Sequence, residues 1–221
     1  MSKKGIEVFQ DLLLHTKSGD LGSIRTALVK NQTAEWQHSA GSEAELLKYS
    51  GSKEDIIQFV HDSNGLPRAG LTLWERESGY AVTNIVPAEK SELSVIEYNA
   101  LLQDFVRQVV QPAQTEAGFF VKITGSVRGL DTWISKESAV LLQRFSALAN
   151  KSTTNSHPSD GKRWEQFVIS VHLEGARLGT DILIQWLIEI DGWDERSSSK
   201  LAIDYEKGLS LLATYDSFAK G

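Results

Sequence analysis

The residues best suited to chemistry in this sequence are three separated side chains that suggest acid–base catalysis. His61 ends one predicted strand, Glu75 ends the next, and Glu97 lies at the start of a predicted helix. A histidine and a carboxylate can transfer protons in a hydrolytic reaction when they lie within hydrogen-bond reach. One hypothesis is therefore a hydrolase whose site is assembled from His61 with Glu75 or Glu97 beside a sheet.

A second group of residues suggests binding instead of catalysis. Four acidic residues fall within the seven residues Glu189–Glu195, around Gly192-Trp193, and no basic residue occurs before Arg196. Aromatic residues anchor protein interfaces and charges steer the encounter, so such a turn would suit a basic partner. A solvated turn between two helices would have the same composition. The candidate partner-binding residues are Asp191, Trp193, Asp194 and Glu195.

A third signal is the glycine-flanked segment Gly125–Gly129, which follows a predicted strand. Its backbone amides and Arg128 could hold an anion, although an ordinary strand-to-helix connection has the same pattern. The chain has neither a phosphate loop nor a dinucleotide-binding fingerprint. It has no cysteine, and its five histidines form no close metal-binding pair. We therefore expect no cofactor and no metal site.

Composition and charge narrow the class of protein further. The 221 residues include 23 Lys and Arg against 29 Asp and Glu, for a formal net charge of −6. This balance argues against a broad nucleic-acid surface and leaves only a local patch around Arg128 and Lys162-Arg163. The longest apolar run, Ile182–Ile190, is interrupted by polar residues and is shorter than the ~18 residues of a membrane span. The first residues lack the apolar stretch of a secretory signal. We expect a cytoplasmic protein with no membrane segment.

Strands and helices that would position these residues can be recognised from periodicity. Short connections between the predicted strands favour an antiparallel meander. The segment Ser94–Glu97 has the form of a capping box, and it begins a long amphipathic helix that Pro112 and Gly118 end. Another helix is predicted at residues 132–149. The predicted strands cover residues 55–60, 69–75, 80–86 and 119–124.

Differences in pattern divide the chain into three expected segments. Residues 1–50 are predicted to be an N-terminal helical segment, because Ile6, Phe9 and Leu12 recur at helical spacing. Residues 51–150 form the α+β core. A polar, turn-rich linker at residues 151–161 begins the C-terminal helical unit, residues 151–221. The expected fold is α+β, with a small antiparallel sheet covered by helices and a C-terminal three-helix unit.

Two function classes remain open from the sequence. The first is a non-catalytic interaction module, for example an acidic antitoxin or immunity-type inhibitor that masks a basic protein. The alternative is the hydrolase-like enzyme with His61, Glu75 and Glu97. The absence of catalytic motifs and the acidic turn at Glu189–Glu195 favour the interaction module.

Overall fold

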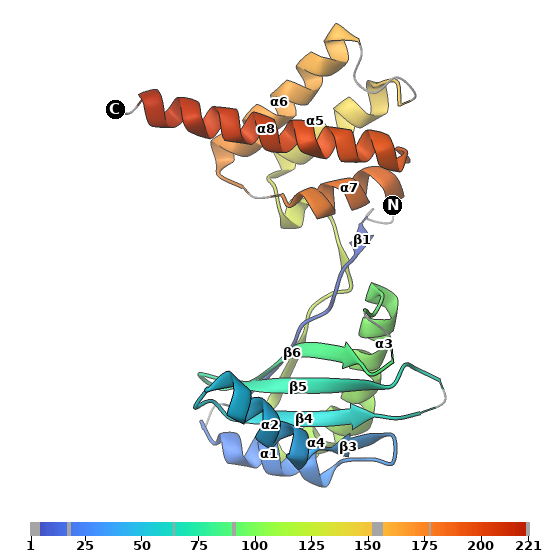
Figure 1. Ribbon diagram of the computed structural model, residues 1–221, viewed down its shortest axis with the longest axis vertical. Helices are drawn as coiled ribbons and strands as arrows, with labels where there is room; N and C mark the ends of the chain where they lie inside the picture. Colours follow the sequence, from blue (N-terminus) through green and yellow to red (C-terminus); the bar gives the residue numbers. More distant parts are fainter. Residues whose placement is uncertain are drawn as a thin grey trace. The chain divides into compact units, whose positions relative to one another are not determined.

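The chain forms two compact units. The computed structural model describes residues 5–16, 19–63, 65–89, 92–151, 157–176 and 178–219. One unit comprises Glu7–Ser126, and the other comprises Val127–Gly221 with Met1–Ile6. The fold is α+β, with antiparallel strands covered by helices, as the sequence predicts (Figure 1).

A six-stranded antiparallel sheet is the centre of the Glu7–Ser126 unit. Its strand order is β3-β4-β5-β6-β2-β7, and β4, β5 and β6 form the predicted meander. The strands are β2 (Leu12–His15), β3 (Trp36–His38), β4 (Ile56–His61), β5 (Ala69–Arg76), β6 (Gly79–Pro87) and β7 (Phe120–Ile123). Two short strands, β1 (Ile6–Glu7) and β8 (Val127–Arg128), form a separate two-stranded sheet.

The prediction of a helical N-terminal segment was wrong for its first part. Residues 6–7 and 12–15 form β1 and β2, and the helices α1 (Leu21–Lys30) and α2 (Ala40–Ser50) follow only later. In β2, Leu12 and Leu14 are buried and alternate with exposed neighbours, which is the period of a strand. The spacing of Leu12 with Ile6 and Phe9 is therefore coincidental, because β2 lies between β6 and β7.

The predicted long helix begins at its capping box but contains an unexpected turn. It consists of α3 (Val95–Phe105), a π-helical turn η1 (Val106–Val110) and α4 (Gln111–Ala117). Pro112 does not end the helix, because it follows the π-helical turn and the backbone of Val110 and Gln111 before it stays helical. Gly118 ends it in the left-handed conformation, with φ at 69°.

The hydrophobic core of this unit lies between the sheet and the long helix. The centroid of the Phe105 ring lies 5.0 Å from that of Trp36 and 5.1 Å from that of Phe59. All three side chains are fully buried. Aromatic packing therefore holds α3 against the β3 and β4 edge of the sheet.

The second unit is helical. Among its described residues it contains four α-helices, where the sequence predicts a three-helix unit beginning at residue 151. It contains the short turn η2 (Leu130–Thr132) and then α5 (Lys136–Leu148), α6 (Pro158–Glu174), α7 (Thr180–Glu189) and α8 (Glu195–Ala219). Phe145 of α5 packs on Trp164 of α6 with ring centroids 4.9 Å apart, so α5 shares the core of the C-terminal helices.

The boundaries expected at residues 50 and 150 consequently do not coincide with those of the two units. Residues 7–50 contribute strands to the sheet, and α5 belongs with the C-terminal helices. Residues 152–156 of the expected linker lie outside the described residues. Among the described residues, no helix combines the length and the apolar character needed to cross a membrane.

Candidate metal centre

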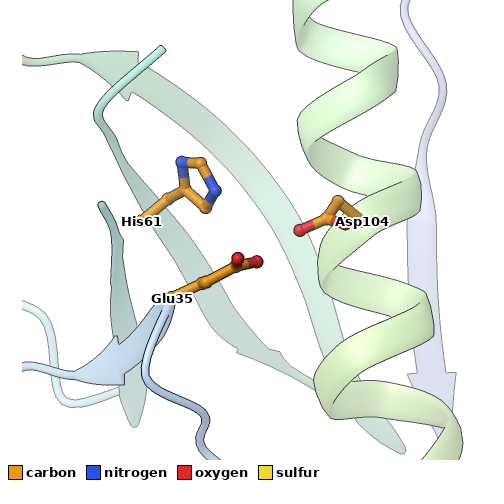
Figure 2. Close-up of side chains that lie close together, drawn as sticks. All are labelled: Glu35, His61 and Asp104. Atoms are coloured by element: carbon orange, nitrogen blue, oxygen red, sulfur yellow. The ribbon is translucent and has the colours of Figure 1, made fainter. Parts of the chain in front are cut away.

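Three metal-ligating side chains from separate parts of the Glu7–Ser126 unit point toward one another (Figure 2). They are Glu35, His61 and Asp104, and their ligand atoms all lie within 4.8 Å of one another. Glu35 is exposed, whereas His61 and Asp104 are 0% and 9% exposed. Two buried ligands and one exposed ligand therefore surround a single point at the edge of the core.

Strand pairing places Glu35 beside His61. In the β3–β4 ladder, Trp36 lies opposite His61, and the Asp62 amide donates to the Glu35 carbonyl at 2.9 Å. The hydrogen-bonded ladder thus continues one residue beyond β3. The backbone of Glu35 is fixed by this pairing, and its side chain is exposed.

His61 is held in one orientation by its surroundings. Its Nδ1 lies 3.1 Å from the Pro67 carbonyl oxygen, and its ring contacts Trp36 with centroids 4.7 Å apart. A carbonyl oxygen only accepts, so in the neutral ring Nδ1 carries the proton and Nε2 carries the lone pair. Ser63 Oγ lies 3.1 Å from Nε2 and can donate to it. This tautomer is the one that ligates a metal through Nε2.

Asp104 is a buried carboxylate with several donors. Trp36 Nε1 donates to its Oδ2 at 2.9 Å, Gln108 Nε2 donates to the same oxygen at 2.8 Å, and Arg107 pairs with Oδ1. Burial by itself would raise the pKa of Asp104, but these hydrogen bonds outweigh it and hold the pKa below its ordinary value. Asp104 is therefore an anion in the folded protein at neutral pH.

The π-helical turn supplies the residues that surround Asp104. Arg107 and Gln108 both lie in η1, directly after the carboxylate that they contact. Gln108 Nε2 also donates to Glu35 Oε2 at 2.5 Å, so one amide group bridges the two carboxylates. π-Helical turns inside α-helices occur frequently at functional sites. Here the turn is part of the candidate centre.

One imidazole and two carboxylates form a donor set that suits a divalent transition metal. Zinc and its neighbours accept both nitrogen and oxygen ligands, and three protein ligands leave coordination positions for water. Ligands on a tetrahedral zinc ion lie about 3.4 Å apart, given bonds of about 2.1 Å. The 4.8 Å cluster would contract on binding an ion, and Glu35, as the exposed member, is the ligand that would move.

The predicted catalytic group of His61, Glu75 and Glu97 is not formed. His61 pairs with Ala69 at one end of β5, whereas Glu75 lies six residues further along that strand, about 20 Å away at ~3.3 Å per residue. Glu75 accepts from the Asp55 amide at 2.7 Å, and Glu97 completes the capping box with Ser94. Both glutamates are used by the fold, and the hydrolase hypothesis loses these two residues.

The predicted partner-binding turn is also largely explained by folding. Trp193 is 3% exposed, stacks on Phe145 and donates to Ser146 Oγ at 2.7 Å, so it is a core residue and cannot be an exposed anchor. Asp194 accepts from the Ser197 amide at 2.9 Å at the start of α8, and the Ser197 hydrogen bonds lower its pKa. Asp191 contributes its carbonyl oxygen to Lys151. Glu195 is exposed in the first turn of α8.

Arg128 lies in a strand and not in an open anion-binding loop. It belongs to β8, which pairs with β1, and its carbonyl oxygen lies 2.8 Å from the point where a Gly5 Cβ would stand. The close approach explains the glycine at position 5. Arg163 of the proposed basic patch bonds to Asp160 Oδ1 at 2.6 Å.

Sequence reasoning missed Glu35 and Asp104. A usable signal existed for Asp104, because it is an acid on the apolar face of the helix between Leu101 and Phe105. A charged residue at such a position is rarely buried without a partner. Glu35 gives no comparable signal, since its position depends on the β3–β4 register.

Comparisons with family models, with curated protein sequences and with solved structures find no match to this chain. Any assignment of function therefore depends on the geometry of its own residues.

Proposed function

We propose that the Glu7–Ser126 unit binds a divalent transition-metal ion through Glu35, His61 and Asp104. The observation that carries the proposal is that an imidazole and two carboxylates converge to within 4.8 Å from three separate segments. The lone pair on His61 Nε2 and the anionic state of Asp104 give two ligands in the form that a metal requires.

The ion would have a structural or regulatory role in this proposal. His61 has no exposed surface and Asp104 has little, so a substrate would reach the ion only past Glu35. A bound ion would connect the residue before β3, the end of β4 and the long helix. It would therefore stabilise the edge of the sheet, which is consistent with a non-catalytic protein.

Metal titration of the full-length protein tests the proposal. After removal of ions with a chelator, we expect one equivalent of Zn²⁺ to bind in calorimetry, and Co²⁺ to give visible absorption from ligand-field transitions. Glu35→Gln should weaken the binding at least tenfold, because it removes a charged ligand. Glu35 is exposed, so this variant should fold normally.

The matched control is Glu45→Gln, which removes the same charge at an exposed position of α2. It should bind Zn²⁺ with the affinity of the parent protein. Equal affinities of the parent and Glu35→Gln would show that any bound ion lies elsewhere, and the proposal would be abandoned.

We also propose that the helical unit binds a basic protein in the cytoplasm, and an exposed apolar stripe on α8 favours this second function. Leu211, Tyr215 and Phe218 follow one another at spacings of four and three, which places them on one side of the helix. They are 70%, 68% and 82% exposed. Apolar stripes of this kind are typical of helices that bind a partner protein.

Charge on the segment that leads into α8 indicates the kind of partner. Residues 180–219 carry eight acidic and three basic side chains, whereas residues 127–179 carry five acidic and seven basic ones. Residues 180–194 carry four of these acids and no basic residue, whereas α8 carries four acidic and three basic side chains, so the negative charge of this unit lies mainly on α7 and the turn before α8. A basic protein with an apolar groove complements such a surface, and the acidic balance argues against nucleic acid.

Photo-crosslinking in the source cells tests the partner. A benzophenone side chain at Phe218 should give an adduct with one basic protein, and the yield of that adduct should fall at high salt. The same group at Ser210, an exposed position on another side of α8, serves as the control. Adducts with a second copy of this chain, or with an acidic protein, would contradict the proposed partner.

A further inference from the structure

Gln108 occupies the position at which a cation would lie between the two carboxylates. Its Nε2 donates to Asp104 Oδ2 at 2.8 Å and to Glu35 Oε2 at 2.5 Å. An amide nitrogen carries two hydrogens and no available lone pair, so it donates a hydrogen bond to each carboxylate but cannot ligate a metal. In this arrangement Gln108 and a metal ion would compete for the same two oxygens.

The oxygen of the Gln108 amide contacts the hydroxyl of Thr33, which can act as a donor or as an acceptor. Thr33 Oγ1 lies 3.1 Å from Gln108 Oε1 and donates to it. A hydroxyl can equally accept, so it would serve an amide nitrogen at the same place. The two ends of a glutamine amide are nearly equal in size. Rotation of the Gln108 amide by half a turn therefore keeps its contact with Thr33.

Resting on the proposed metal function, we propose that Gln108 is the fourth ligand and that its amide rotates when the ion binds. Without an ion, the NH₂ group holds Glu35 and Asp104 together. With the ion present, Oε1 faces the metal and the NH₂ group turns to Thr33. The rotation exchanges two hydrogen bonds for one coordination bond, and it exposes no buried polar atom.

The rotation makes the site selective for a doubly charged ion over a singly charged one. In the metal-free protein Gln108 donates a hydrogen bond to each carboxylate, so the binding free energy of an entering ion must exceed the loss of those two hydrogen bonds. The completed donor set has one nitrogen and three oxygens, which suits Zn²⁺ or Mn²⁺ better than soft Cu⁺. Gln108 thus sets the threshold for binding as well as the final coordination.

Nuclear magnetic resonance of the full-length, ¹⁵N-labelled protein can observe the rotation. Gln108 Nε2 and Trp36 Nε1 both donate to Asp104 Oδ2, so their hydrogens lie close together. The metal-free protein should show a nuclear Overhauser effect between the Gln108 amide and the Trp36 indole hydrogen. Saturating Zn²⁺ should remove it and produce one between the same amide and the Thr33 methyl group.

Affinity measurements with two matched variants complete the test. Gln108→Glu supplies a charged ligand oxygen and should tighten Zn²⁺ binding at least tenfold. Gln111→Glu adds the same charge at an exposed position of α4 and should change the affinity by less than threefold.

The failures of the two proposals are distinguishable. If Zn²⁺ binds and Glu35→Gln weakens it, but the Gln108 amide keeps its contact with Trp36, then the metal centre stands and the rotation is wrong. The same conclusion follows if Gln108→Glu and Gln111→Glu have equal effects. If Zn²⁺ does not bind the parent protein, both the proposed function and the rotation are wrong.

Discussion

Tyr205 illustrates how burial alone changes the chemistry of a single residue in this protein. Its ring is 1% exposed and stacks on Phe167 with centroids 5.8 Å apart. Desolvation raises the pKa of Tyr205 to about 12, although the Leu178 backbone opposes the shift. The unfolded chain ionises its tyrosines near pH 10. The phenol is therefore more acidic in the unfolded state than in the folded one.

The stability of the folded protein at alkaline pH should therefore depend on Tyr205. Because the folded pKa is raised, the contribution of Tyr205 is complete below pH 10 and is lost as the pH rises from 10 to about 12. Over that interval the parent protein should lose on the order of 2 kcal/mol of unfolding free energy that Tyr205→Phe keeps, measured by urea unfolding at pH 9 and pH 12. Tyr215→Phe, on the same helix but 68% exposed, should retain the pH dependence of the parent. Identical profiles for the parent and Tyr205→Phe would contradict the prediction.

Single residues also define how far the candidate centre can be predicted from sequence. The role of Glu97 as a helix-capping residue follows from Ser94 three positions earlier, because a capping box is local. The convergence of Glu35, His61 and Asp104 is not local, since it requires the β3–β4 register and the packing of Trp36 on Phe105. Pairing of this kind is set by the whole core, and no short segment encodes it.

At the scale of elements, the contact between β2 and β6 depends on one glycine. A Cβ added to Gly79 would stand 1.7 Å from the Leu14 carbonyl oxygen, closer than any two such atoms can approach. Tyr80 and Ala81 continue the same ladder opposite Leu14 and Leu13. The absence of a side chain at position 79 thus allows β2 to enter the sheet between β6 and β7.

We therefore predict that Gly79→Ala strongly destabilises the Glu7–Ser126 unit. The backbone of β2 or β6 must move, and we expect a loss of at least about 3 kcal/mol, measured by urea unfolding. Gly41→Ala is the matched control, because Gly41 lies in α2 with no atom within 4 Å of an added Cβ. This variant should be neutral or stabilise by about 0.5–1 kcal/mol. Comparable losses for both variants would show that the contact at Gly79 is not the cause.

The sequence predicts which segments form strands and helices better than it predicts which strands pair. The meander of β4, β5 and β6 was expected because short turns connect adjacent strands. The insertion of β2 between β6 and β7 was not, because the pairing partners of β2 are residues 79–81 and 120–123. Likewise, Pro112 was expected to end a helix that in fact continues through it, since the π-helical turn precedes it.

At the scale of the whole molecule, the two units differ in charge. Residues 7–126 carry 16 acidic and 10 basic side chains, whereas the other unit, residues 1–6 and 127–221, carries 13 of each. Counting along the chain suggests that most of the negative charge lies after residue 160, but the units assign the larger excess to the sheet-containing part. Carboxylates that attract a cation are therefore more abundant in the unit that carries the candidate centre.

The prediction at this scale is that metal binding stabilises only one unit. Scanning calorimetry of the metal-free protein should show two transitions, one for each compact unit. Zn²⁺ at 100 times its Kd should raise one transition by an amount equivalent to about 2.7 kcal/mol and leave the other unchanged. In Glu35→Gln, whose affinity is at least tenfold weaker, the same Zn²⁺ concentration should shift this transition by no more than about 1.4 kcal/mol. A shift of both transitions in the parent protein would contradict a centre confined to residues 7–126.

The π-helical turn has a consequence for the evolution of this chain. An α-helix advances by about 100° for each residue, so Asp104 and Ala113, nine residues apart, would face opposite sides of a regular helix. Both are buried, because Val106–Val110 accommodates one residue more than a regular turn. Loss of a single codon in this segment would restore a regular helix and keep α4 facing the core, but it would remove the turn that holds Arg107 and Gln108 against Asp104. Relatives with and without the centre should therefore differ in length here, which makes a one-residue gap the feature to seek in newly sequenced genomes.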